Sequence, residues 1–465
     1  MARQKNAGPG ASGSSTRQTG VDRARAPTRA AVIVPVLPRA FRHDDEAAQN
    51  RPRLTRSPDA RHEEAVGLAQ AIDLDIVYSA VIVVNDPRPA TLLGSGKVQE
   101  VAGIVKENEA EVVIFDHPLT PVQQRNLEKE LNAKVLDRTA LILEIFGERA
   151  RTKEGALQVE LAHLNYQKGR LVRSWTHLER QRGGGGFLGG PGETQIEADR
   201  RVLQDKIIKL KRELETVRRT RDLHRAKRKK VPFPVVAIVG YTNAGKSTLF
   251  NKLTGAGVLA EDMLFATLDP TLRRVRLPHG TPVILSDTVG FISDLPTHLV
   301  AAFRATLEEV VEADLVIHLR DIADPDTAAQ AEDVERILGD LGVDAGDRSR
   351  VIEVWNKIDL LDDSNRARLL GEETDTHEPP IAISAVTGEG LGTLTAIIEQ
   401  RVSGELREMT VTLRPDQLGL TDWLYRNGDV VSRQDNEDGS VSITIRATEI
   451  ARGEIESRLH NKNKT

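Results

Sequence analysis

The segment GYTNAGKS, Gly240 to Ser247, has the residue types and the spacing of a phosphate-binding loop. It fits the pattern G-x-x-x-x-G-K-[ST], in which backbone N–H groups surround phosphates, the lysine adds a positive charge and the hydroxyl binds Mg²⁺. The apolar run from Val235 to Val239 precedes this loop, and STLFNKLTG follows it. A buried strand before the loop and a helix after it are the required context. We therefore predict that Lys246 faces the β- and γ-phosphates and that Ser247 is a Mg²⁺ ligand.

Two further segments are predicted to complete the metal end of this site. In DTVG, which follows the strand-like run PVILS, we expect Asp287 to hold Mg²⁺ through a water molecule and the Gly290 N–H to contact the γ-phosphate. Between the two loops, LFATLDPT offers Thr267 and Thr271, and Thr267 is the better candidate for the Mg²⁺ ligand and γ-phosphate sensor. Such a loop becomes ordered with a triphosphate and is released after hydrolysis. We predict Lys246, Thr267 and Gly290 as the catalytic residues.

The base-binding end is predicted from two segments that each follow a strand-like run. In NKID, Asn356 to Asp359, the carboxylate of Asp359 can accept hydrogen bonds from both N1–H and the 2-amino group of guanine. Adenine lacks both donors, so ATP would leave this carboxylate unpaired. The segment SAVTG, which starts at Ser384, would bring backbone N–H groups to the guanine O6. The phosphate loop, DTVG, NKID and SAVTG, in this order, predict a site for GTP and GDP, and not for ATP.

The predicted GTP-binding residues belong to these four segments, to the start of the following helix and to LFATLDPT. They are Gly240, Tyr241, Thr242, Asn243, Ala244, Gly245, Lys246, Ser247, Thr248, Phe265, Ala266, Thr267, Leu268, Asp269, Asp287, Thr288, Val289, Gly290, Asn356, Lys357, Asp359, Ser384 and Ala385. The predicted metal-binding residues among them are Ser247, Thr267 and, through water, Asp287.

Two positions in these loops bear on the rate of hydrolysis. Phe291 stands directly after Gly290, where many GTPases have a glutamine that orients the attacking water. An apolar side chain cannot do this by hydrogen bonding, so we predict slow hydrolysis alone and faster hydrolysis when a partner completes the site. Asn243 occupies the loop position at which cation-activated GTPases carry an asparagine that coordinates K⁺. K⁺ is therefore a candidate cofactor beside Mg²⁺, and an ordinary loop residue is the alternative.

Composition limits the class of protein around this site. The chain has 465 residues, which predicts roughly three domains. It has no cysteine, which excludes disulfides, thiolate zinc sites and cysteine nucleophiles. No apolar run approaches the ~20 residues of a membrane span, and the N-terminus has no signal-peptide core. We expect a soluble, cytoplasmic protein without membrane contact, and nothing in the sequence demands a dimer, so we expect a monomer.

The N-terminal part divides into an extension and an α/β unit. Residues 1–60 are rich in Arg, Ala, Gly, Ser and Pro, which predicts a disordered extension, although it contains the short apolar run AVIVPVL. From residue 61 to 150, strand-like runs such as DIVYSAVIVVN and EVVIFD alternate with helical ones, which predicts a parallel sheet. GSGK, Gly94 to Lys97, is only a fragment of a phosphate-loop pattern. A helix start is the favoured interpretation and an anion site is the alternative.

Residues 151–230 are predicted to form a helical hairpin. Leucines recur at helical spacing from Leu157 to Leu171, and apolar residues alternate three and four apart from Ile196 to Val217. The most glycine-dense stretch of the chain, GGGGFLGGPGET, lies between these helices, so no strand precedes it as a nucleotide loop would require. Two interpretations remain open: a flexible connector, or a projecting loop whose arginines contact phosphates of a large partner.

Two units complete the domain organisation. Residues 231–403 contain all four nucleotide segments and are predicted to form the GTP-binding domain. Residues 404–465 read as a strand, a helix, a hairpin with its turn near Gly439 and a final helix. The predicted fold class is α/β and multidomain: an N-terminal α/β subdomain, a long α-helical hairpin, a P-loop GTPase domain and a small α+β C-terminal domain.

These motifs together are similar to those of a known family. RGGGGFLGGPGETQIEADRR, GYTNAGKSTLFNKLT, LFATLDPTLRR and DTVGFI closely resemble the HflX GTPases, relatives of the Obg group, over roughly residues 60–465. The resemblance implies this same architecture, binding to the large ribosomal subunit and its RNA, and splitting of ribosomes, notably under stress. It also implies that the hairpin tip approaches the peptidyl-transferase region and that Phe291 is compatible with activity. The residues then expected to contact the ribosome are Arg182, Gly184, Phe187, Leu188, Arg200 and Arg201.

Two features depart from the family. The extension of residues 1–60 lies outside the shared pattern, and Phe187 and Leu188 stand where other members often carry polar or basic residues. We expect a GTPase that splits or rescues stalled or idle ribosomes. One alternative is a GTP-dependent sensor of RNA or ribosome assembly. Another is an ATP-driven RNA remodelling factor, with the basic run from Arg218 to Lys230 as its RNA surface.

Overall fold

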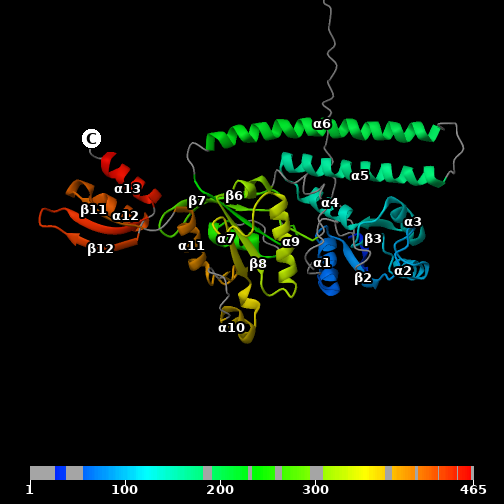
Figure 1. The fold of residues 1–465 in the computed structure, drawn as a ribbon, viewed down its shortest axis with the longest axis horizontal. Helices are drawn as coiled ribbons and strands as arrows, with labels where there is room; N and C mark the ends of the chain where they lie inside the picture. The colour runs from blue at the N-terminus through cyan, green and yellow to red at the C-terminus, as the bar shows by residue number, and fades with distance from the viewer. Residues whose placement is uncertain are drawn as a thin grey trace, which may run out of the picture.

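The described part of the chain contains three β-sheets with their flanking helices and one pair of long helices. The computed structural model describes residues 27–37, 56–181, 191–228, 233–256, 264–265, 267–293, 307–371, 380–403, 407–427, 429–447 and 449–461. Figure 1 shows the three sheet-containing units in a row, with the two long helices along one side. Within these ranges no helix is long and apolar enough to cross a membrane. The predicted fold class is confirmed.

The N-terminal unit is a parallel four-stranded sheet in the order β2-β1-β3-β4, with helices on both faces. Its elements are β1 (Arg29–Val36), α1 (Pro58–Gln70), β2 (Asp75–Val83), α2 (Ser95–Glu107), β3 (Val112–Phe115), α3 (Pro121–Leu131), β4 (Lys134–Asp137) and α4 (Arg138–Arg149). Alternate residues of β1 face two cores, one built with α1 and α4 and the other with α2 and α3. GSGK begins α2, and Lys97 there forms an exposed ion pair with Glu100, so the favoured interpretation as a helix start is confirmed.

The prediction of disorder for residues 1–60 is wrong for Arg29–Val36. This segment forms β1, whose central residues are buried and which pairs with both β2 and β3. Pro35 argues against a central strand, because proline cannot donate to the ladder. The pairing of β1 with β3 nevertheless ends at Ile33. Pro35, which has no N–H to donate, therefore lies beyond that ladder. The N-terminal unit therefore begins before residue 61, while residues 1–26 and 38–55 lie outside the described residues.

The predicted helical hairpin consists of α5 (Lys153–Gln181) and α6 (Pro191–Arg228). The two helices share an apolar seam whose buried members are Leu157, Leu161, Leu164, Ile207, Leu210 and Leu214. At 1.5 Å per residue, the 38 residues of α6 extend about 57 Å. The connection between the helices, residues 182–190, lies outside the described residues. Figure 1 shows α5 and α6 side by side along the N-terminal unit and the central domain.

The central domain holds a six-stranded sheet in the order β10-β9-β8-β5-β7-β6, parallel except for β6. Its elements are β5 (Val235–Gly240), α7 (Lys246–Thr254), β6 (Thr271–Arg276), β7 (Pro282–Asp287), β8 (Leu315–Asp321), α9 (Thr327–Asp340), β9 (Val351–Asn356), the 3-10 helix η3 (Ile358–Leu360), α10 (Asp363–Gly371), β10 (Ile381–Ala382) and α11 (Leu391–Ser403). The carboxyl ends of β5, β7, β9 and β10 lie at one edge because these strands are parallel. The four predicted nucleotide segments start at this edge.

The C-terminal domain is a three-stranded antiparallel sheet, in the order β11-β13-β12, with helices on one face. Its elements are β11 (Arg407–Leu413), the 3-10 helix η4 (Pro415–Leu420), α12 (Thr421–Asn427), β12 (Asp429–Asp435), β13 (Val441–Ala447) and α13 (Glu449–Asn461). The turn between β12 and β13 contains Gly439 at φ 80°, a left-handed conformation that glycine adopts easily. The predicted order of strand, helix, hairpin and helix is confirmed.

Candidate functional site

The phosphate-binding loop runs from the end of β5 to the start of α7, as its flanking residues predict. Two of its glycines leave no room for a side chain. A Cβ at Gly240 would overlap the carbonyl oxygen of Leu319 in β8, and a Cβ at Gly245 would overlap the side-chain nitrogen of Asn356. Gly245 also has φ 91°, which favours glycine. The loop is therefore pressed against β8 and against the base-binding end of the site.

Lys246 is buried at the start of α7. Its Nζ donates a hydrogen bond to the Tyr241 carbonyl oxygen at 2.6 Å, and a Cβ placed on Gly290 would lie 3.0 Å from the same nitrogen. Burial lowers the pKa of Lys246 to about 8, an effect that the Asp287 carboxylate opposes and the Lys357 ammonium increases. The structure thus places Lys246 and Gly290, both predicted to be catalytic, directly beside each other.

The lowered pKa of Lys246 predicts that GTP binding takes up a proton in mildly alkaline solution. Near pH 8 about half of the unliganded molecules carry a neutral lysine, whereas the triphosphate favours the charged form. Calorimetric titrations with GTP in two buffers of different ionisation enthalpy should therefore report uptake of about 0.5 proton at pH 8. The affinity should fall as pH rises above 8. Proton uptake indistinguishable from zero would contradict this prediction.

The three residues predicted to hold a metal ion come together. The hydroxyl of Ser247 and that of Thr267 donate to Asp287 Oδ2, at 2.8 Å and 2.9 Å, and lie 3.1 Å from each other. The second carboxylate oxygen, Oδ1, is buried and lacks a hydrogen-bond partner among the described residues. Burial raises the pKa of Asp287, although the bonds from Ser247 and Thr267 and the charge of Lys246 oppose the rise. A water molecule bound to a cation would supply the missing partner of Oδ1, and the cation's charge would offset this cost of burial.

This set of oxygen atoms fits Mg²⁺. Hydroxyl and carboxylate oxygens are its usual protein ligands, and phosphate oxygens and water complete its coordination in nucleotide sites. Among the described residues, no three His, Cys, Asp or Glu side chains are grouped so that they could hold a metal by themselves. A magnesium ion at this place would therefore depend on the nucleotide for part of its coordination.

The predicted base-binding segments meet at Asn356. Its side-chain nitrogen donates to the Ala244 carbonyl oxygen at 2.8 Å, and its side-chain oxygen accepts from the Ala385 N–H at 3.0 Å. These bonds tie the NKID segment to the phosphate loop on one side and to SAVTG on the other. Asp359 lies in η3 with an exposed side chain, which leaves its carboxylate open to a base.

The neighbouring residues hold these segments in shape. Lys357 adopts φ 67°, and its ammonium pairs with Asp321 at the end of β8 at 2.7 Å. The Ser384 hydroxyl accepts from the Thr387 N–H at 3.1 Å and so shapes the SAVTG turn. The Thr288 hydroxyl donates to the Ile238 carbonyl oxygen of β5 at 2.6 Å. These contacts position backbone groups of the site, and they occupy the side chains of Lys357 and Thr288.

The remaining predicted GTP-binding residues differ in exposure. Thr242 is buried and Asn243 is exposed, with Asn243 in a left-handed conformation at φ 60°. Thr248 lies in the first turn of α7 and is partly exposed. Val289 is buried in the core that the central domain shares with the N-terminal unit. Ala266 lies outside the described residues.

The segment around Thr267 packs against the N-terminal unit. Phe265, at φ 58°, places its ring edge-on to Phe146 of α4 with ring centroids 4.8 Å apart. Leu268 is buried in the same core. The carboxylate of Asp269 accepts hydrogen bonds from the chain at the start of α5. Phe265, Leu268 and Asp269 therefore use their side chains for contacts with other units, so only their backbone is free to contact a nucleotide.

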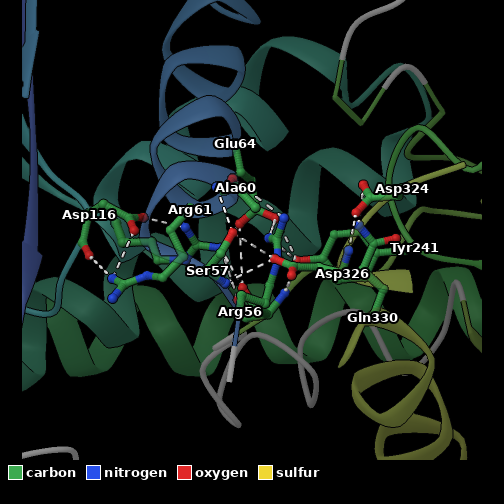
Figure 2. Close-up of polar contacts among 12 residues, drawn as sticks. Arg56, Ser57, Ala60, Arg61, Glu64, Asp116, Tyr241, Asp324, Asp326 and Gln330 are labelled. Carbon is green, nitrogen blue, oxygen red and sulfur yellow. Dashed lines mark hydrogen bonds and ion pairs between the residues drawn. The ribbon is translucent and has the colours of Figure 1, made fainter. Parts of the chain in front are cut away.

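Tyr241 likewise turns its side chain into the N-terminal unit. Its buried hydroxyl donates to Glu64 of α1 at 2.6 Å and accepts from the Ser293 N–H at 2.9 Å. Burial and the Glu64 carboxylate raise the pKa of Tyr241 well above its usual value, so the hydroxyl keeps its proton and remains a donor. Arg56 donates to the same hydroxyl at 2.9 Å and pairs with Glu64 (Figure 2). Any contact of Tyr241 with a nucleotide would therefore use its backbone.

The buried charges around Glu64 extend through the N-terminal unit. Arg138, at the start of α4, pairs with both Glu64 and Asp116 and also donates to the Ser293 carbonyl oxygen at 3.1 Å. Arg61 donates to Asp116 at 3.0 Å, as Figure 2 shows. Burial alone would raise the pKa of Asp116, but Arg138 and Arg61 hold it below its usual value. These charged groups connect α1 and α4 to the chain just after DTVG.

On the side of α9, the same network ends at two acidic residues. Asp326 accepts from the Ser57 N–H at 3.0 Å and from its hydroxyl at 3.3 Å, immediately before α1 begins. Asp324 accepts from Gln330 at 2.7 Å, beside Asp326 in Figure 2. Sequence analysis missed this network, because Glu64 and Tyr241 are 177 positions apart and no spacing relates them. The signal that the sequence offers is the helical spacing that puts Glu64 on the same face of α1 as the apolar Leu68.

Phe291 is buried in the core shared by the two units. Its N–H donates to the Gly240 carbonyl oxygen at 3.1 Å, and its own carbonyl oxygen accepts from the Thr242 N–H at 2.8 Å. The backbone of Phe291 thus braces the phosphate loop, while its ring packs among apolar side chains. This ring cannot hold a water molecule by hydrogen bonding, as the sequence indicates.

Most of the residues predicted to contact the ribosome lie outside the described residues: Arg182, Gly184, Phe187 and Leu188. Arg200 and Arg201 lie on α6 and are exposed. Among the described residues of this helix, Val202 and Ile208 are exposed apolar side chains at 54% and 39%. The described part of α6 therefore offers basic and apolar groups to a partner.

The four parts of the chain match four protein families. Residues 59–147 match the GTP-binding GTPase N-terminal family, residues 149–228 the GTP-binding GTPase middle region, residues 235–357 the family described as 50S ribosome-binding GTPase, and residues 370–465 the HflX C-terminal domain. "GTPase HflX" of Magnetococcus marinus is 48% identical over 409 residues, which cover 87% of this chain and 93% of that protein. The chain belongs to the HflX family of GTPases. It is a GTP hydrolase.

A second HflX relative and a solved structure are also similar to this chain. "GTPase HflX" of Escherichia coli K12 is 47% identical over 360 residues, which cover 77% of this chain and 83% of that protein. Among solved structures, one titled as the complex of SsGBP and GDP is 24% identical and covers 81% of this chain and 98% of that chain, with a TM-score of 0.44. The P-loop GTPases to which the HflX family belongs generally use Mg²⁺.

Proposed function

We propose that this HflX GTPase binds the large ribosomal subunit and splits or rescues stalled or idle ribosomes. It hydrolyses GTP slowly alone and faster on the ribosome. The observation that carries the proposal is the burial of Phe291, because the position that often orients the attacking water offers no polar group. The description of the family matched by residues 235–357 and the exposed basic groups on α6 support a ribosomal partner.

The residues of the site have distinct proposed roles. Lys246 and the Gly290 N–H would hold the γ-phosphate, since they lie beside each other under the loop. Ser247, Thr267 and, through water, Asp287 would hold Mg²⁺, which would neutralise charge on the phosphate oxygens. Asp359 would select guanine, in a position fixed by the bonds of Asn356 to both neighbouring loops. Because Phe291 cannot orient water, a group of the partner or an ordered backbone group would do so.

The exposed Asn243 supports K⁺ as a second proposed cofactor. Its left-handed conformation keeps the side chain out of the packed interior of the loop, where an amide oxygen could contact a monovalent cation beside the phosphates. Replacing K⁺ by Na⁺ at constant ionic strength should then lower the rate of GTP hydrolysis. The Asn243→Ala variant should hydrolyse GTP at one rate in both salts. A wild-type rate that does not change between the two cations would overturn the role of K⁺.

Ribosome splitting can be tested by sedimentation. Intact ribosomes are incubated with the full-length protein and GTP, GDP or a non-hydrolysable GTP analogue, and the subunits are separated on a sucrose gradient. We expect separate subunits with the triphosphates, little change with GDP, and the protein in the fractions of the large subunit. Binding to the large subunit without splitting would instead favour a sensor of ribosome assembly. Splitting that requires ATP would favour the remodelling factor.

We also propose that the protein is a cytoplasmic monomer and that it contacts ribosomal RNA through the hairpin. The hairpin tip and the outer face of α6 would make this contact, with Arg200 and Arg201 near the tip. Phosphate contacts weaken steeply with salt. Binding to large subunits should therefore lose affinity between low and moderate salt, and the loss should be smaller for a variant that lacks both arginines.

A further inference from the structure

The segment that carries Thr267 is joined to the helical hairpin by a single carboxylate. Asp269 Oδ2 accepts hydrogen bonds from the N–H groups of Arg151 and Thr152, at 2.9 Å and 2.8 Å. Its Oδ1 accepts from the Thr152 hydroxyl at 2.6 Å. These groups directly precede α5, which begins at Lys153, so the carboxylate lies at the positive end of that helix. Asp269 therefore binds the N-cap residue of α5, Thr152, from another domain.

Gly155 allows this close approach. A Cβ at this position in the first turn of α5 would lie 2.5 Å from Asp269 Oδ1, which no ordinary packing permits. Gly155 has no left-handed conformation to explain its presence, since it lies in a regular helix. The Gly155 N–H donates to the Thr152 hydroxyl at 3.0 Å, which orients that hydroxyl for its bond to Asp269. The start of α5 is thus shaped for the carboxylate.

The same short segment also reaches the metal end of the nucleotide site. Two residues before Asp269, the Thr267 hydroxyl donates to Asp287 at 2.9 Å and lies 3.1 Å from that of Ser247. Residues 267–269 span only a few ångströms of chain. If Thr267 moves away from Asp287, the backbone that it shares with Asp269 must therefore change, and Asp269 is pulled from the start of α5. One end of this segment lies at the site where a γ-phosphate would be sensed, and the other end holds the hairpin.

We propose that Asp269 couples the nucleotide state to the helical hairpin. When Thr267 is held at the metal site by a triphosphate, Asp269 binds the N-cap residue of α5 and fixes the base of the hairpin to the central domain. When Thr267 leaves after hydrolysis, the contact between Asp269 and Thr152 opens and the hairpin base is released. Thermodynamic linkage makes this coupling reciprocal. If the triphosphate raises the affinity for a partner that fixes the hairpin, that partner raises the affinity for the triphosphate by the same factor. The coupling requires GTP binding but no ribosome, so it can fail or hold independently of ribosome splitting.

Amide hydrogen exchange measures this coupling directly. The full-length protein is saturated with a non-hydrolysable GTP analogue or with GDP, and saturation is checked with fluorescent analogues of the two nucleotides. Exchange is then followed in a peptide that spans residues 150–156. We expect the amides of Arg151 and Thr152 to exchange about tenfold more slowly with the GTP analogue, a ratio within the usual range of allosteric coupling. Equal exchange in the two states would overturn the proposal.

Variants on both sides of the contact separate coupling from stability. Asp269→Ala removes the acceptor. Gly155→Ala is a change in the hairpin that displaces the Asp269 carboxylate and leaves every residue of the nucleotide segment as it is. Because alanine favours a helix more than glycine does, Gly155→Ala should not weaken α5 itself. Both variants should reduce the nucleotide-dependent ratio to less than about twofold. A wild-type ratio in Gly155→Ala would contradict the proposal, even if Asp269→Ala failed to fold.

The same helix offers a matched control. Gly169 also lies within α5, and a Cβ added there meets nothing within 4 Å among the described residues. Gly169→Ala should therefore keep the full wild-type ratio. Thr120→Ala provides a second control, since it removes the N-terminal cap of α3 instead. Loss of the ratio in either control would show that the response follows general stability, and it would overturn the role of Asp269.

Discussion

Glu64→Ala is expected to destabilise the contact between the N-terminal unit and the central domain by about 3–5 kcal/mol, because it removes the shared partner of buried groups. The Glu64 carboxylate pairs with Arg56 and Arg138 and accepts from the Tyr241 hydroxyl at 2.6 Å. Its loss would leave two guanidinium groups without this buried counter-charge and would remove an acceptor from a buried hydroxyl. Thermal unfolding of the full-length protein measures the effect, which should be a fall of the first transition by roughly 10 °C.

The adjacent residue provides the control for this prediction. Glu63 lies on the same helix and is exposed, so Glu63→Ala changes the same residue type outside the network. Its unfolding midpoint should stay close to that of the wild type, because exposed charges contribute little. Equal shifts for Glu63→Ala and Glu64→Ala would mean that the buried network does not hold the two units together.

Asp359→Asn is expected to weaken GTP binding by a factor of roughly 10²–10⁴. The two hydrogen-bond donors of guanine would then meet an amide whose NH₂ group is itself a donor. The exposed Asp359 carboxylate lies in η3, three positions after Asn356. The Asn356 side chain fixes this segment by its bonds to the phosphate loop and to SAVTG. Xanthine carries an oxygen where guanine has its 2-amino group. The variant should therefore bind xanthosine triphosphate better than GTP, which competition with a fluorescent nucleotide can measure.

A neighbouring aspartate tests whether charge alone produces this effect. Asp363 lies in the first turn of α10, and its side chain is exposed. Asp363→Asn removes one negative charge four positions after Asp359, and it should leave the preference for GTP over xanthosine triphosphate unchanged. The role of Asp359 in guanine recognition would be refuted if Asp359→Asn retained wild-type affinity for GTP and showed no gain for xanthosine triphosphate.

Much of the site could be predicted because nucleotide loops are local. The phosphate loop, DTVG, NKID and SAVTG each follow one of the parallel strands of the sheet, and parallel strands bring their carboxyl ends to one edge. Of the two candidate threonines, Thr267 donates to Asp287 and Thr271 begins β6, while the metal-binding role of Thr267 stays a prediction. The helical hairpin also followed from local periodicity, and its apolar seam is buried as expected.

The contacts that join the units could not be predicted in this way. Tyr241 and Asp269 belong to segments whose pattern indicates nucleotide binding, yet their side chains bind α1 and the start of α5. These partners are distant in the sequence and have no shared period. Strand β1 was missed for a related reason: its surroundings have the composition of a disordered segment, and Pro35 interrupts its apolar run. Tertiary pairing with β2 and β3 outweighs this local signal.

We propose that the nucleotide site becomes fully active only when the protein is bound to a partner. The most direct test is GTP turnover in K⁺ buffer with Mg²⁺, measured for the protein alone and with purified large ribosomal subunits. We expect slow turnover for the protein alone and acceleration of ~10³-fold or more with the subunits, since an external group would orient the water that Phe291 cannot. The same turnover in both reactions, with normal GTP binding, would contradict this proposal.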